Sequence, residues 1–80
     1  METFVVSVYN EDSGMSEPAK IFHTKGKAIR YIIKREGINM DSEEIDDLYQ
    51  DLIKNNEVTS YDHEIENSYF ISRMILSDDD

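Results

Sequence analysis

The sequence has no cysteine, no tryptophan, one proline and three glycines in 80 residues. Without cysteine the chain forms no disulfide and no thiolate metal site, so an oxidising compartment is not implied. The three glycines do not make a glycine-rich phosphate loop. The N-terminal stretch METFVVSVYNED lacks both the basic start of a signal peptide and an apolar run long enough to span a membrane. We therefore expect a soluble, cytoplasmic protein.

Positive charge is also scarce, because eight Lys and Arg residues stand against eighteen Asp and Glu residues, for a formal net charge of −10 at pH 7. Residues 1–35 have six cations and four acids, whereas residues 36–80 have two cations and fourteen acids. A charge of this sign repels nucleic acid and anionic lipid surfaces. The sequence thus disfavours direct binding to nucleic acid or membranes and indicates a basic partner.

Motifs for catalysis and metal binding are missing as well. No serine lies in a G-x-S-x-G motif, and Asp and Glu pairs are too common to assign a general acid and base. The calcium-loop signature is absent, and His23 and His63 are far apart in the sequence, with no H-E-x-x-H motif. The sequence therefore predicts no enzyme, no metal site and no cofactor.

The hydrophobic content of 39% is enough for one small core, so we expect a single domain over residues 1–77 and an acidic tail at residues 78–80. Thr3 to Tyr9 alternates as a strand rich in β-branched and aromatic residues. Asn10 to Ser16 consists of turn formers and closes a hairpin. The next strand, Ala19 to His23, either begins after Pro18 or lies at a sheet edge.

Two amphipathic helices follow. Thr24 is predicted to cap the first, and Gly37 to be the left-handed residue after its end. Asp41 is predicted to cap the second, over residues 41–54, before Asn55 and Asn56 end it. The apolar stripe of the first helix consists of Ala28, Ile29, Ile32 and Ile33, and that of the second of Ile45, Leu48, Tyr49, Leu52 and Ile53.

The pattern then returns to strands, from Val58 to about Ile65 and from Tyr69 to Leu76, although Asp62 and His63 offer a competing turn. The element order is β-β-α-α-β-β. It predicts an α+β fold with two layers, in which an antiparallel sheet of about four strands has both α-helices on one face.

Acidic side chains gather on the outward arc of the second helix. Six carboxylates lie between Asp41 and Asp51, about one per 2.7 Å of helix, against one phosphate per ~1.7 Å of duplex DNA axis. This near-match predicts a DNA mimic that binds the cationic surface of a basic DNA-binding host protein and blocks DNA binding. The candidate contacts are Glu43, Glu44, Asp46, Asp47 and Asp51 on the helix and Glu64, Glu66, Asp78, Asp79 and Asp80 elsewhere.

A second interpretation is that the acidity serves only solubility. The chain would then be an ordinary protein-interaction module or a homodimer formed through an exposed strand. This interpretation predicts partner binding that is insensitive to salt and centred on apolar residues, whereas mimicry predicts fast association that salt weakens. Tyr61 and Tyr69 are candidate aromatic anchors, with cross-strand packing as their ordinary role.

The stretch FVVSVYNEDSG followed by AKIFHTKGKAIRYI, in a short acidic chain, resembles the small early proteins of bacteriophages that shut off host functions. Some proteins of that group imitate DNA and inhibit uracil-DNA glycosylase, CRISPR nucleases or the histone-like nucleoid protein HU. The size and the lack of cysteine make this chain similar to the inhibitor of the histone-like protein. The resemblance implies HU as the partner and the host cytoplasm as the location. It rests on general character and no motif, so it assigns no functional residue.

Overall fold

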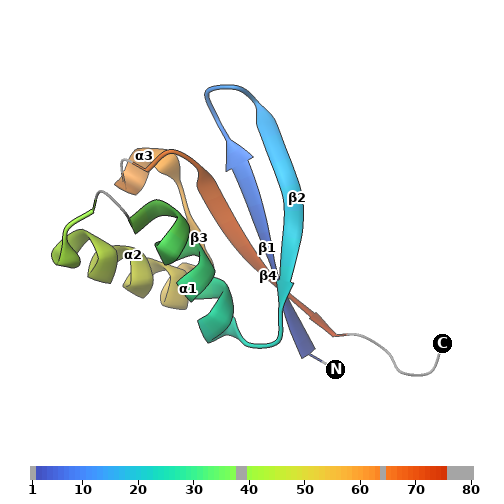
Figure 1. The fold of residues 1–80 in the computed structure, drawn as a ribbon. Helices are drawn as coiled ribbons and strands as arrows, with labels where there is room; N and C mark the ends of the chain where they lie inside the picture. The colour runs from blue at the N-terminus through green and yellow to red at the C-terminus, as the bar shows by residue number, and fades with distance from the viewer. Residues whose placement is uncertain (1, 38–39, 64, 76–80) are drawn as a thin grey trace.

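A computed structural model of the chain describes residues 2–37, 40–63 and 65–75. The elements are β1 (Glu2–Asn10), β2 (Met15–Phe22), α1 (Lys25–Glu36), α2 (Ser42–Asn55), β3 (Glu57–Val58), α3 (Ser60–His63) and β4 (Ser68–Ile75). The strands form one antiparallel sheet in the order β2-β1-β4-β3, and both long helices lie on one side of it (Figure 1). The predicted α+β class is therefore confirmed, as is the order β-β-α-α-β-β of its main elements.

The first hairpin follows from its turn residues. Asn10 and Met15 are the last pair between β1 and β2, and Gly14 between them has a φ of 71°, which favours glycine. The Gly14 N–H donates to the Asn10 carbonyl at 2.9 Å. β2 begins earlier than predicted and lies at the sheet edge, where the register with β1 shifts at Pro18. An edge position and a bulge both tolerate a residue that lacks an N–H.

Helix α1 begins as predicted and ends differently. The Thr24 hydroxyl oxygen accepts from the Lys27 N–H at 3.2 Å, which confirms the N-cap. Gly37 is not left-handed, because its φ is −78°. Its N–H bonds the Ile33 carbonyl, and its own carbonyl accepts from the Met40 N–H at 3.2 Å. Gly37 itself is therefore right-handed, and the prediction of a left-handed Gly37 is wrong.

Helix α2 has the predicted ends and a narrower buried stripe. An Asp41 carboxylate oxygen accepts from the Glu44 N–H at 2.8 Å, and Asn56 ends the helix in the left-handed conformation. Leu48 and Leu52 are fully buried and Ile45 is half-buried, but Tyr49 and Ile53 are 38% and 41% exposed. The stripe is narrower because α2 makes its main contacts with α1 and β3, at the side of the fold.

The core lies between the helices and one face of the sheet. Alternate residues of the two central strands point into it, and α1 covers them. None of the described helices combines the length and apolar character needed to cross a bilayer. The buried apolar residues are Val6, Val8, Ala28, Ile29, Ile32, Leu48, Leu52, Val58, Ile65, Tyr69 and Ile71.

The segment between α2 and β4 corrects the predicted second hairpin. β3 contains only Glu57 and Val58, and residues 60–63 form a helical turn where a strand was predicted. The Thr59 hydroxyl accepts from the Asp62 N–H at 3.2 Å, which favours a helical start over a continued strand. Ile65 then enters the core, and β4 follows from Ser68 to Ile75. The predicted end at Leu76 lies outside the described residues.

The opposite face of the sheet has no helix on it among the described elements (Figure 1). Large apolar side chains are exposed there: Tyr9, Ile21, Phe70 and Met74. Among the paired positions of this face that the structure describes, Glu57, opposite Phe70, is the only charged residue. We call this surface the open sheet face.

Candidate functional site

The acids of α2 lie on the side away from the core but do not form one uniform row. At about 100° per residue, four of them fall within an arc of about 100°. Asp46 lies about 60° beyond that arc, on the flank that carries the exposed Ile53. The structure thus groups four of the five predicted acids of this helix and separates Asp46. The four are Glu43, Glu44, Asp47 and Asp51.

Helix α3 adds a fifth carboxylate beside this arc. Asp62 lines the same hollow, of about 250 Å³, as Glu44 and Asp47, together with Met40, Tyr61 and His63. Residues 60–63 form a helical turn in place of the predicted strand, and this turn packs its polar residues against the flank of α2. Asp62 is therefore beside the acids of α2. We define the acidic surface as Glu43, Glu44, Asp47, Asp51 and Asp62.

His63 ties the two helices together. Its Nε2 lies 2.6 Å from Oδ2 of Asp51, and its side chain is only 11% exposed. Asp51 keeps 44% of its side chain exposed, so it fixes α3 and still contributes to the surface. The geometry of the acidic surface is therefore set by a contact between two of its own elements.

Tyr61 is the exposed aromatic residue of this region, with 77% of its surface accessible. Hydrogen bonding to Glu11 and the negative charges of Glu11 and Asp12 raise its pKa above the usual tyrosine value. The phenol therefore stays neutral and able to donate a hydrogen bond within an anionic environment. Glu11 and Asp12 come from the β1–β2 turn, and sequence reasoning missed them because only the tertiary fold brings that turn to α3.

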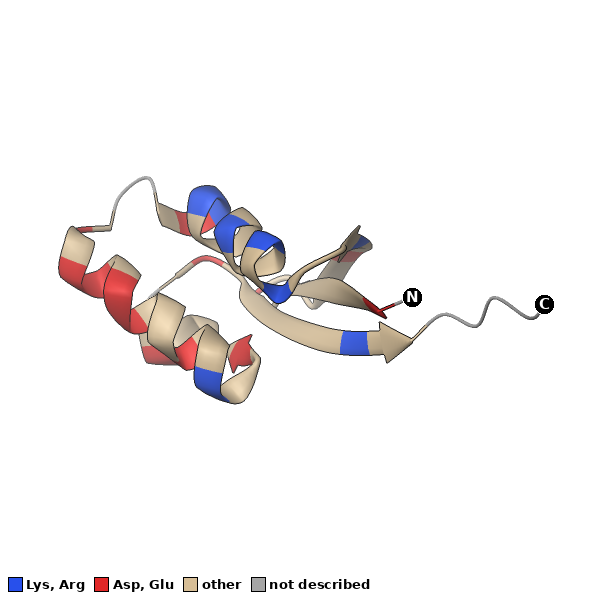
Figure 2. Cartoon of the chain, turned by 90° about the horizontal axis from the view of Figure 1, so that it is seen from below, with Lys and Arg blue, Asp and Glu red and all other residues tan. Residues whose placement is uncertain are grey.

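Within the described part of the chain, no Lys or Arg forms an ion pair with the acidic surface, whose contact with a basic side chain is that of Asp51 with His63. The two Arg ion pairs join Arg35 to Glu17 at 2.5 Å and Arg73 to Glu2 at 2.6 Å. The Lys25 ammonium donates to the Ile53 carbonyl at 2.8 Å. Figure 2 shows acids along most of α2 and cations gathered on α1, although α2 also has one cation, Lys54, in its last turn.

The other predicted contacts do not join this surface. Glu66 is exposed and lines a separate hollow, of about 370 Å³, with Arg35 and Glu36. Glu64, Asp78, Asp79 and Asp80 lie outside the described residues. Tyr69 is buried in the core, and its hydroxyl donates to Glu36. Within residues 2–37, 40–63 and 65–75, no three His, Asp or Glu side chains are placed to hold a metal ion.

Comparison of the chain with protein-family models, curated proteins and solved structures finds no match. The charges, exposure and contacts of the surface itself are therefore the basis for a functional proposal.

Proposed function

We propose that the chain is a non-enzymatic inhibitor that occupies the cationic DNA-binding surface of a basic host protein in place of DNA. The observation that supports this function is the acidic surface. Its five carboxylates come from two helices held together by His63 and Asp51, and the described ion pairs of Arg35 and Arg73 are with other acids, Glu17 and Glu2.

The spacing of these carboxylates suits a site that binds phosphates. From Glu43 to Asp51, four acids span about 12 Å of helix axis, a mean axial separation of about 4 Å, compared with one phosphate per ~3.4 Å of duplex axis for one DNA strand. A cationic groove that meets this row exchanges its bound anions for fixed carboxylates. Association is then fast at low salt and weakens as salt screens the charges.

Tyr61 gives the surface a second kind of contact. Rim charges are individually weak, and interface energy concentrates on a few residues, among which tyrosine is over-represented. Tyr61 lies among Glu11, Asp47 and Asp62, so its ring is exposed where the negative charges converge. We therefore assign it the role of an aromatic anchor within the mimic.

The partner proposed is a histone-like nucleoid protein of the HU type in the host cytoplasm. This choice combines the resemblance to phage early proteins with the charge of the acidic surface, which requires a cationic partner.

The test is displacement of labelled duplex DNA from HU by the chain, followed by fluorescence anisotropy at about 50 and about 200 mM salt. A D47N/D62N variant loses two charges from the acidic surface, and the control E57Q/E66Q loses two exposed charges elsewhere. We expect the first variant to need roughly tenfold more protein for the same displacement and the control to match the wild type. Equal displacement by all three proteins would remove the proposal.

The open sheet face supports a second candidate, a homodimer. In a chain with a net charge of −10, two copies approach most easily where charge is lowest, and this face presents Glu57 alone among its described paired positions. The exposed Phe70 and Ile21 would then be buried against the second copy. Sedimentation of the wild type as a dimer at high salt, and of Phe70→Glu as a monomer, would support this candidate, whereas a monomeric wild type would exclude it.

A further inference from the structure

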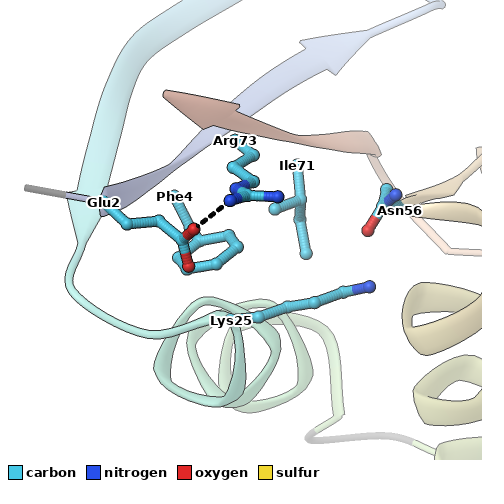
Figure 3. A pocket seen from close by; sticks show the side chains of 6 residues that line it. All are labelled: Glu2, Phe4, Lys25, Asn56, Ile71 and Arg73. Carbon is cyan, nitrogen blue, oxygen red and sulfur yellow. Dashed lines mark ion pairs between the residues drawn. The ribbon is translucent and has the colours of Figure 1, made fainter. Parts of the chain in front are cut away.

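A pocket of about 480 Å³ lies where the sheet meets the start of α1 and the end of α2. Figure 3 shows Arg73 and Ile71 entering it from β4, Phe4 from β1 and Lys25 from α1. Glu2 and Asn56 complete the lining. Phe4 and Ile71 provide an apolar wall, since both pack in or against the core. The pocket thus combines apolar and charged groups at a size typical of sites for small ligands.

The polar groups of this pocket have more donors than their described contacts use. The guanidinium of Arg73 has five N–H groups, and its described partner is Glu2, at 2.6 Å. The Lys25 ammonium has three N–H groups, and its described hydrogen bond is to the Ile53 carbonyl. Asn56 adds a side-chain amide. Two cations against one carboxylate leave the lining with a net positive charge, which favours an anionic ligand.

The position of the pocket separates it from the acidic surface. In residues 36–80 the cations are Lys54 and Arg73, and Arg73 lines the pocket while Lys54 is in the last turn of α2. Along the helix axis, Glu43, Glu44 and Asp47 lie about 14 to 20 Å from Asn56, whereas Asp51 lies about 8 Å from it. Over more than a Debye length of about 10 Å, salt largely screens exposed charges from one another. An anion can therefore bind at this end of a chain that is acidic as a whole.

We infer that this pocket binds a carboxylate attached to an apolar body. The carboxylate bonds the free N–H groups of Arg73, in the two-point geometry that guanidinium favours. The apolar body covers Phe4 and Ile71, and the Lys25 ammonium attracts the anion from the far side. Such a group occurs in free aryl-alkanoic acids and at the C-terminus of a peptide ending in an apolar residue. An extended peptide would also pair with β4 beyond Ile71, whose N–H already donates to the Asn56 carbonyl at 2.7 Å.

The experiment is a titration of the isotope-labelled chain with 3-phenylpropionate, observed through its backbone amide NMR signals. We expect shifts centred on Phe4, Lys25 and Arg73, and no such shifts with the uncharged 3-phenylpropanol. Arg73→Gln and Lys25→Met should each weaken binding roughly tenfold, which corresponds to the loss of a charge-assisted hydrogen bond. Lys27→Met is the matched control, because Lys27 is on the same turn of α1 and does not line the pocket.

The Glu2→Gln variant best distinguishes a ligand-binding role of Arg73 from a structural one. Because Glu2 competes with the ligand for Arg73, its neutralisation should tighten binding several-fold, whereas a merely structural ion pair would leave binding unchanged or weaker. An acetylated tetrapeptide ending in phenylalanine distinguishes the sources: tighter binding than 3-phenylpropionate indicates a peptide C-terminus, and equal binding a free acid.

The inference would be overturned if 3-phenylpropionate and 3-phenylpropanol bound equally well. It would also be overturned if the Arg73→Gln variant, shown by circular dichroism to be folded, bound 3-phenylpropionate as well as the wild type does. None of these outcomes depends on the acidic surface, so the pocket and the proposed inhibitor function can fail separately.

Discussion

Replacing Asp47 by Asn is expected to stabilise the fold, because Asp47 lies at the centre of the unneutralised charges of α2. Glu43, Glu44 and Asp51 are its neighbours at i−4, i−3 and i+4, and each such like-charge pair costs about 0.2–0.5 kcal/mol on an exposed helix. Removing all three gives about 0.6–1.5 kcal/mol. For a domain of this size the melting temperature should rise by about 3–10 °C.

Asp46→Asn is the matched control, with the same chemical change one residue away. Asp46 has one acid at these spacings, Glu43, so its stabilisation should be about a third as large. Thermal unfolding followed by circular dichroism at low salt measures both variants, and the difference should shrink as salt screens the pairs. Equal effects of the two substitutions, or an effect of D47N that does not change with salt, would refute the view that α2 holds repelling charges at a cost in stability.

Two further predictions concern the backbone and a buried hydroxyl. Gly14→Ala should destabilise by about 1 kcal/mol, because its φ of 71° is left-handed although a Cβ would meet open space. Gly26→Ala should stabilise the fold by about 0.5–1 kcal/mol, because Gly26 is within α1 and a Cβ there would also meet open space. Chemical denaturation that showed both substitutions changing the free energy of unfolding in the same direction would contradict this reasoning. Burial and Glu36 raise the pKa of Tyr69, so the folded state holds that proton more tightly than the unfolded state, and stability should fall as the pH rises above about 10. When the pH is raised from about 8 to about 11, the free energy of unfolding measured in urea should fall less for the Tyr69→Phe variant than for the wild type. Equal decreases would show that another group is responsible.

Local chemistry was enough to predict the helix starts and the first hairpin. Thr24 and Asp41 accept the hydrogen bonds expected of N-caps, and Asn56 ends α2. These predictions hold because a cap depends on residues within one turn of it. For β2, Pro18 left two alternatives, a strand that begins after it or a strand at the sheet edge, and the structure has the second.

The wrong predictions concern features that tertiary packing determines. The apolar stripe of α2 was predicted too wide, because periodicity does not reveal that α2 packs at the side of the fold and leaves Tyr49 and Ile53 exposed. The strand predicted from Val58 to Ile65 fails because the Thr59 hydroxyl supports a helical turn at Asp62 and Ile65 turns into the core.

The same limit applies to the functional surfaces. Helical spacing placed Asp46 with Glu43, Glu44, Asp47 and Asp51 on the outward side of the second helix, because residues three and four apart share a helix face. The approach of Glu11 and Asp47 to Tyr61 joins segments from three parts of the chain, and no local pattern predicts it. The pocket around Lys25 and Arg73 was missed for the same reason, since its lining comes from three separate elements, β1, α1 and β4, and from the residue that follows α2.

The acidic surface can be tested most directly by mapping where a basic partner touches the chain. In this measurement the isotope-labelled chain is titrated with HU and its backbone amide signals are recorded before and after excess duplex DNA is added. The proposed function predicts signal changes centred on Glu44, Asp47 and Asp62, which the DNA then reverses. Changes centred on Phe70 and Ile21 of the open sheet face, or changes that persist when DNA is present, would contradict the mimicry of DNA.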